Sequence, residues 1–327
     1  MEIRVVDALG ARVISREGLR AALDDPDSLV WIDIPVCDEA ARSLLVHDLG
    51  FHLVAVREAA TRQRMPKMHR YPDHVFVVLH VPMLGEGGHV HYVELDQFIG
   101  RQLLVTVHGP TNPAVPSWVP LRETGGVWER VSEGRFRPNT AIELSRAIVS
   151  AMSQEMEYSL EVLTGDVWKL EQAVTSGSIR DPERFLEEMF RVRHALLAVD
   201  NMSQGGGVVY GRLRRVIRAV DPEDREALAD TSDQLSRVHE LASGQRDYLQ
   251  GIIDFYRTRL DTKMTIAAQR LSVVAAVTLP ATALASVLGM NLIVSDSTET
   301  AVLFPIIVLM LVMTVMVLWW ARKRDWW

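Results

Sequence analysis

The sequence predicts an α/β domain, a helical stalk and two C-terminal transmembrane helices, in that order along 327 residues. Short apolar or alternating runs fill the first third, a long proline-free stretch follows, and two stretches without Asp, Glu, Lys or Arg, 271–288 and 301–320, end the chain. We therefore expect an α/β domain over 1–138, a helical stalk region over 139–270 and a transmembrane domain over 271–327.

The α/β domain is expected from five segments with the apolar patterns of strands, 3–6, 29–34, 75–81, 89–99 and 103–107. Helices fit between them, and Asp38 is placed to cap one that ends at Gly50. Four prolines after the last strand predict a turn-rich connection with room for a short helix. Gly125-Gly126 is expected to interrupt the chain there.

The stalk begins where the strand patterns stop. Residues 140–176 carry apolar side chains at helical spacing, and Asp-Pro-Glu at 181–183 and again at 221–223 resembles an N-cap with proline in the first turn. The first motif opens a helix expected to end near Gln204, before a run of three glycines. The second opens a long pore-directed helix, from about 222, that runs without proline into the first uncharged stretch. A helix of this length cannot bury its apolar residues in a small domain, so we expect it to associate with copies of itself.

The two uncharged stretches are long enough to cross a bilayer, at roughly 27 and 30 Å for helices. Basic residues precede the first and follow the second, whereas the loop between them has none and carries Asp296 and Glu299. This asymmetry predicts that both termini lie in the cytoplasm and the loop outside, in the cell (inner) membrane. A buried helical hairpin of a soluble protein is the disfavoured alternative.

Composition limits the function. Cys37 is the single cysteine, so an intrachain disulfide and a cysteine-based metal site are excluded. The formal net charge of −7 argues against nucleic acid as a partner and is compatible with cations. No phosphate-binding loop, nucleophile elbow or HExxH motif occurs, so we do not expect an enzyme.

Gly289-Met290-Asn291 follows the first span directly, and Pro280 and Thr282 lie inside that span. With the α/β domain, the long helix and the basic tail, this resembles the CorA family of magnesium and cobalt transporters. The resemblance implies a funnel-shaped homopentamer in the lipid bilayer, whose first spans line a central pore for Mg²⁺, with Co²⁺ and Ni²⁺ as further cargo. It places a ring of Gly-Met-Asn turns at the outer mouth, where Asn291 would hydrogen-bond the waters of a hydrated cation. The alternative is that Asn291 only ends a helix.

One stripe of the first span fits such a pore, because its residues recur at steps of three and four. In a five-fold assembly the leucines would form apolar constrictions, and Thr282 and Ser286 would offer hydroxyls to ion-bound water. Packing of small residues between helices is the alternative use of the same stripe. The stripe consists of Leu271, Ala275, Leu279, Thr282, Ser286 and Met290.

The resemblance also implies a regulatory metal site on the stalk. Asp230 and Asp233 align with acidic positions where, in the family, cytoplasmic Mg²⁺ bridges neighbouring subunits and holds the channel closed, and Glu86 is the candidate partner ligand. A solvated acidic helix face is the alternative for Asp233, and the favoured one for Glu86.

Two departures from the family pattern leave the metal open. Leu288 replaces the usual aromatic residue before Gly-Met-Asn, and the outer loop lacks the common Met-Pro-Glu-Leu sequence. The related ZntB proteins move Zn²⁺ on the same fold, so a proton-coupled Zn²⁺ transporter is the alternative function. Neither span contains an ionisable residue that would favour proton coupling.

Overall fold

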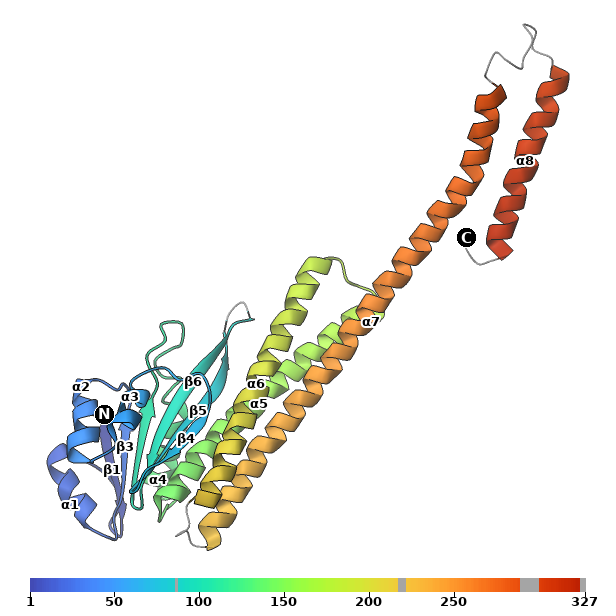
Figure 1. Ribbon diagram of the computed structural model, residues 1–327. Helices are drawn as coiled ribbons and strands as arrows, with labels where there is room; N and C mark the ends of the chain where they lie inside the picture. The colour runs from blue at the N-terminus through green and yellow to red at the C-terminus, as the bar shows by residue number, and fades with distance from the viewer. Residues whose placement is uncertain (86–87, 217–221, 289–299, 324–327) are drawn as a thin grey trace. The chain divides into compact units, whose positions relative to one another are not determined.

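The computed structural model describes residues 1–85, 88–216, 222–288 and 300–323. Their contacts divide the chain into two compact units, Met1–Gly251 and Ile252–Trp327. The first unit contains a seven-stranded sheet with strand order β2-β1-β3-β7-β6-β5-β4 (Figure 1). The strands are β1 (Glu2–Asp7), β2 (Gly10–Ile14), β3 (Leu29–Ile34), β4 (Lys67–Arg70), β5 (Val75–Leu84), β6 (Val90–Ile99) and β7 (Leu103–His108).

All neighbouring strands pair antiparallel except β3 and β7, which are parallel. The helices are α1 (Leu19–Asp24), preceded by the 3₁₀ turn η1 (Arg16–Gly18), α2 (Glu39–Ser43), continued by the π-helical turn η2 (Leu44–Asp48), α3 (Leu53–Ala59), α4 (Arg122–Ser132), α5 (Ala141–Ser176), α6 (Pro182–Val216), α7 (Pro222–Leu288) and α8 (Thr300–Lys323).

The two faces of the sheet bury different partners. On one face Phe76 and Phe98 pack with Phe51 and the apolar side chains of α2, η2 and α3. On the other face α4, α5 and α6 cover the sheet, where the Ser145 hydroxyl of α5 bonds both Gln97 of β6 and Tyr210 of α6. The helices α5 and α6 thus share the core of the α/β layer.

The five expected strands are all present, and two further strands complete the sheet. Both added strands, β2 and β4, lie at its edges and contain no buried residue, so they lack the buried apolar positions that mark the others. One expected cap is also confirmed, since Asp38 accepts a hydrogen bond from the backbone N–H of Ala41. The structure adds a second cap at the start of α5, where Thr140 accepts a hydrogen bond from the backbone N–H of Glu143.

Two expected breaks are wrong. Gly125-Gly126 lies inside α4, and α6 continues through the glycines at 205–207 to Val216. The glycines of α6 stay helical because neighbours pack where side chains would project. A Cβ at Gly205 would lie 2.7 Å from Cγ of Pro66, and one at Gly206 would lie 3.1 Å from Leu235 of α7. Close helix packing therefore outweighs the low helix propensity of glycine.

Helices α6 and α7 are also joined by a buried carboxylate. Asp200 of α6 lies 2.5 Å from Nδ1 of His239 and 2.5 Å from Nη1 of Arg246, both on α7. Burying a charged carboxylate is costly, and partners such as these offset that cost. From Pro222 onward α7 is one helix of 67 residues that passes Pro280 and ends at Leu288, as the spacing of its prolines predicts.

Candidate ion pathway and metal-binding residues

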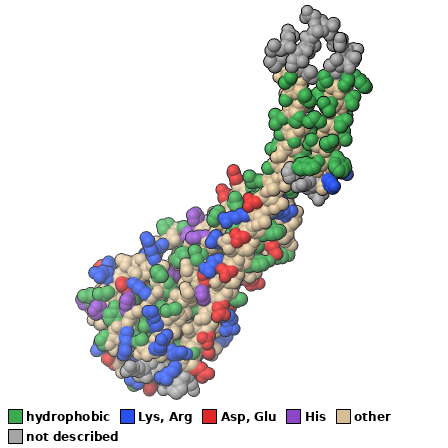
Figure 2. All heavy atoms as spheres, turned by 45° about the vertical axis from the view of Figure 1, so that its right-hand side comes forward, with side chains coloured by type: hydrophobic (Ala, Val, Ile, Leu, Met, Phe, Trp, Pro, Cys, Tyr) green, Lys and Arg blue, Asp and Glu red, His purple; other side chains and the backbone are tan. Residues whose placement is uncertain are grey.

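In the part of the chain that the structure describes, two helices are long and apolar enough to cross a membrane, the C-terminal part of α7 and α8. Figure 2 shows hydrophobic side chains covering the described surfaces of these segments, whereas charged side chains gather on the first unit. Proline at position 280 has no N–H to give the carbonyl of Ala276, yet the helix continues. The second unit therefore has the length and the surface of a membrane hairpin.

Within that unit, α7 packs on α8 through one face. The residues of α7 on this face surround a gap of only about 10 Å³, close to the size of a single water molecule. Val273 of α7 and Ala321 of α8 are buried. The gap is lined by Ala276, Val277, Pro280, Ala281 and Leu284 of α7 and by Met310, Met313, Thr314 and Val317 of α8.

The predicted pore stripe lies on the other face of α7. At about 100° per residue, its positions centre roughly 180° around the helix axis from the face that packs on α8. Leu271 and Leu279 are 70% and 67% exposed. Ala275, Thr282 and Ser286 are also exposed. The stripe is therefore not used for packing within the chain.

The stripe has a chemistry that suits hydrated cations. The Thr282 hydroxyl donates its proton to the carbonyl of Thr278 at 2.8 Å. Its oxygen lone pairs stay available as acceptors, and waters bound to a cation are hydrogen-bond donors. Leu279, about one turn earlier in α7, contributes an exposed apolar side chain to the same stripe.

The predicted mouth of the pathway lies outside the described residues. This holds for Gly289, Met290 and Asn291, for Asp296 and Glu299 of the outer loop, and for Glu86, the candidate partner ligand of the regulatory site.

The two stalk carboxylates are described, and both are exposed on α7. Asp233 lines a groove between α6 and α7 together with Arg212, Arg214, Arg215 and His239. Among the described residues no group of three or more His, Cys, Asp or Glu side chains is placed to hold a metal. Within one chain, then, Asp230 and Asp233 do not form a complete site, and ligands from a second chain would be required.

Two histidines of the α/β layer, His91 and His108, have polar partners within the layer. His108 is buried, and its Nε2 lies 2.9 Å from Asp33. That contact, together with Thr106, lowers the pKa of Asp33 even though burial opposes the shift. His91 approaches the Asn112 amide at 3.4 Å. These contacts favour a structural role over a zinc site for both residues.

Sequence reasoning missed a buried acidic cluster on β6. Glu94 and Asp96 point to the same face of the sheet, and Asp96 is fully buried. Burial raises the pKa of Glu94 to about 7 and holds that of Asp96 well above its ordinary range, with the charge of Glu94 as a second cause. Two carboxylates at alternate interior positions of one predicted strand were the available signal.

Comparison with known proteins connects most of the chain to one family. A family model described as CorA-like Mg²⁺ transporter protein matches residues 26–323. The chain is 22% identical over 275 residues to YfjQ of Bacillus subtilis, a protein named for metal ion transport, with 82% of this chain and 81% of that protein covered. It is 19% identical over 282 residues to the cobalt/magnesium transport protein CorA of Thermotoga maritima, with coverages of 85% and 77%.

Solved structures share the fold. The complete CorA magnesium transporter of Methanocaldococcus jannaschii superposes with a TM-score of 0.78 at 17% identity, covering 100% of this chain and 99% of that one. The cytoplasmic domain of ZntB from Vibrio parahaemolyticus gives a TM-score of 0.62 at 10% identity, over 80% of this chain and 98% of that one. At these identities the structures show a common fold.

Proposed function

The chain belongs to the family of CorA-like Mg²⁺ transporter proteins, and from this membership we propose that it forms a homopentameric channel for hydrated divalent cations. The family consists of membrane transporters and channels for divalent metals, and not of enzymes, as the sequence predicts. Mg²⁺ is the proposed cargo, with Co²⁺ and Ni²⁺ as further substrates, and the membrane potential drives entry by about 2.3 kcal/mol per charge per 100 mV.

The two-faced surface of α7 carries this proposal. One face packs on α8, and the opposite stripe, from Leu271 to Ser286, is exposed in the single chain. Five copies arranged with these stripes inward would place the hydroxyls of Thr282 and Ser286 around a water-filled path and the leucines at constrictions. The α8 helices would then face lipid.

At the outer mouth, Asn291 is proposed to select the cation by its hydration shell. Mg²⁺ holds its waters tightly, and a ring of neutral amides accepts hydrogen bonds from them without binding the ion too strongly for release. Gly289 and Met290 would shape the turn, and Asp296 and Glu299 would attract cations to it.

The Asn291 assignment is tested by Mg²⁺ flux into proteoliposomes that contain a trapped Mg²⁺-sensitive dye. Asn291→Ala should abolish flux or reduce it severely while the oligomer still assembles. Asn201→Ala, at an exposed position of α6, is the matched control and should conduct like the parent. Full flux through an assembled Asn291→Ala protein would show that this residue only ends the helix.

The same assay separates the two candidate cargoes. A channel should pass Mg²⁺ without a pH gradient, because neither span carries an ionisable residue. Zn²⁺ flux that requires a proton gradient, with little Mg²⁺ flux, would instead support the proton-coupled Zn²⁺ transporter.

Gating is proposed to depend on cytoplasmic Mg²⁺ bound by Asp230 and Asp233, with Glu86 of a neighbouring copy as partner. Without the cation, carboxylates on adjacent stalks repel, so the closed assembly loses stability. Asp230→Asn combined with Asp233→Asn should weaken inhibition by internal Mg²⁺ and leave conduction intact. Asp247→Asn, another exposed carboxylate of α7, is the control. Identical inhibition curves for the double variant and the parent would remove the sensor assignment.

Both termini are proposed to lie in the cytoplasm, because basic residues flank the hairpin and the loop has none. In a Cys37→Ser background, Ser297→Cys should react with an impermeant thiol reagent added from outside. Labelling from the cytoplasmic side alone would reverse the topology.

A further inference from the structure

A cavity of about 360 Å³ opens at the edge of the α/β layer, and it belongs to neither the ion pathway nor the stalk site. It lies beyond the carboxyl ends of β3 and β7, the parallel pair of the sheet. After β3 the chain crosses to the α2–α3 face, and after β7 it crosses to the α4 face. Such a topological switch point is where open α/β sheets bind small ligands.

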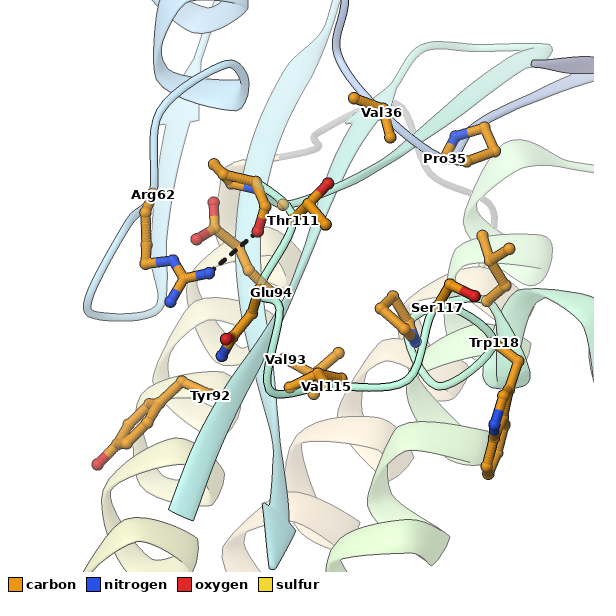
Figure 3. Close-up of a pocket in the computed structure, with 15 residues that line it drawn as sticks. Pro35, Val36, Arg62, Tyr92, Val93, Glu94, Thr111, Val115, Ser117 and Trp118 are labelled. Carbon is orange, nitrogen blue, oxygen red and sulfur yellow. Dashed lines mark hydrogen bonds between the residues drawn. The ribbon is translucent and has the colours of Figure 1, made fainter. Parts of the chain in front are cut away.

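The cavity has an apolar end, formed by the segments that follow the two strands. Pro35 and Val36 follow β3, and Val115 and Trp118 come from the loop after β7 (Figure 3). Trp118 is 62% exposed, although it lines a cavity of this size. An indole beside an apolar hollow offers a flat surface for a ring to stack against.

The other end of the cavity is polar. Arg62 donates one hydrogen bond to the carbonyl of Pro110 at 3.0 Å, and none of the described carboxylates forms an ion pair with its guanidinium. Beside it the Glu94 side chain is only 3% exposed. Its Oε2 accepts a bond from the N–H of Gln63 at 2.7 Å, while Oε1 has no partner. Gly109 permits this arrangement, because a Cβ there would lie 2.6 Å from that of Glu94.

We propose that this cavity binds a small organic anion with a flat apolar body, which stacks near Trp118 and pairs with Arg62. The volume suits a compact ligand, at the lower end of the range for small-molecule sites. Arg62 retains N–H groups with which to hold a carboxylate, sulfonate or phosphate in a charge-assisted contact. The site is contained in Met1–Gly251 and does not depend on the transport proposal.

Glu94 gives the site a pH dependence. Below about pH 7 its carboxyl is neutral, and above that pH its charge repels an anion held at Arg62. The groups around it do not reverse this sign. Burial lowers the pKa of His80, so its imidazole is uncharged near pH 7 and above. Burial also raises the pKa of Asp96 and so opposes the ionisation of that carboxyl. Lys67 is paired with Glu58 at 2.9 Å. Anion affinity should therefore fall as the pH rises through about 7.

The test uses full-length protein in nanodiscs, saturation-transfer NMR and two probes of nearly equal shape. Naphthalene-1-sulfonate carries a permanent negative charge, and naphthalene-1-sulfonamide is neutral at pH 6.5. Empty nanodiscs provide the background. At that pH the affinity for the sulfonate should exceed the affinity for the sulfonamide by a factor of about ten or more. In the parent its affinity should weaken toward pH 8, whereas Glu94→Gln should keep the low-pH affinity throughout.

Matched variants locate the site. Arg62→Gln should reduce sulfonate binding to the level of the sulfonamide, and Arg62→Lys should retain the preference. Trp118→Ala should weaken both probes, whereas Trp168→Ala, at an exposed tryptophan of α5, should change neither. Failure of the sulfonate to bind, an unchanged charge preference in Arg62→Gln, or equal losses for the two tryptophan variants would overturn the proposal.

Discussion

Large apolar side chains are buried in the α/β layer but exposed on the C-terminal helices. In the layer, Trp31, Phe76 and Phe98 are fully buried between the sheet and its helices. On α8, Phe304, Leu311 and Trp319 are each at least 60% exposed. The α/β layer buries its apolar side chains within one chain. The C-terminal helices leave an apolar surface that only lipid or further copies of the chain can cover.

The same contrast occurs along α7. Leu235, Val238 and Leu249 are buried in the first unit, while Leu271 and Leu279 farther along the helix are exposed. The change does not follow hydrophobicity, since all five side chains are apolar. It follows the number of neighbours that one chain supplies, and so identifies where lipid or further copies of the chain would cover the helix.

The largest expected effect separates two phenylalanines. Phe98→Ala should cost about 3–5 kcal/mol of local stability, because Phe98 is fully buried and stacks on Phe51 at 4.6 Å between ring centroids. Phe304→Ala, at a side chain that is 71% exposed, should leave that stability unchanged. Hydrogen exchange of β5 and β6 peptides in the full-length protein measures both. Equal losses would erase the contrast between the regions.

A smaller effect concerns the buried acid on β6. The pKa of Glu94 is raised from 4.5 to about 7, so its ionisation is less favourable in the folded state. The parent should therefore lose about 2–4 kcal/mol of local stability as the pH rises from below 4.5 to above 7. Glu94→Gln should lose much less over this range. Hydrogen exchange of β6 amides at pH 5 and pH 8 measures this loss of stability. The same pH dependence in the parent and in Glu94→Gln would contradict the burial of this carboxyl.

The smallest effect compares two helical glycines. Gly205→Ala should destabilise the packing of α6 against the segment before β4 by about 1–3 kcal/mol, because the added methyl group would lie 2.7 Å from Pro66. Gly165→Ala on α5 meets open space and should stabilise by up to about 1 kcal/mol. Thermal unfolding of the two variants decides the point. If both substitutions changed the stability in the same direction, the close packing of α6 at Gly205 would be contradicted.

The sequence predicts what depends on local pattern. Asp38 is a capping residue that acts within a few positions, and the apolar run of the central strand β3 indicates burial on both faces. Edge strand β4 is largely exposed and has no such pattern. The glycines of α6 stay helical because of Pro66 and Leu235, which lie far away in sequence.

The candidate sites show the same limit. The spacing of Leu279, Thr282 and Ser286 marks a stripe, but only the structure shows that α8 packs on the opposite face. The cavity beside Arg62 and Trp118 could not be predicted, because four segments separated along the chain form it. Asp230 and Asp233 remain predictions, since one chain does not complete their site.

The central claim is that the exposed stripe of α7 lines the ion path and the α8-facing residues do not. Single cysteines on each face, in a Cys37→Ser background, test this claim through block of Mg²⁺ flux by a charged methanethiosulfonate reagent. Thr282→Cys and Ser286→Cys should be blocked, whereas Ala281→Cys and Leu284→Cys should conduct as before treatment. Block confined to the α8-facing pair, or absent from both faces in conducting channels, would contradict it.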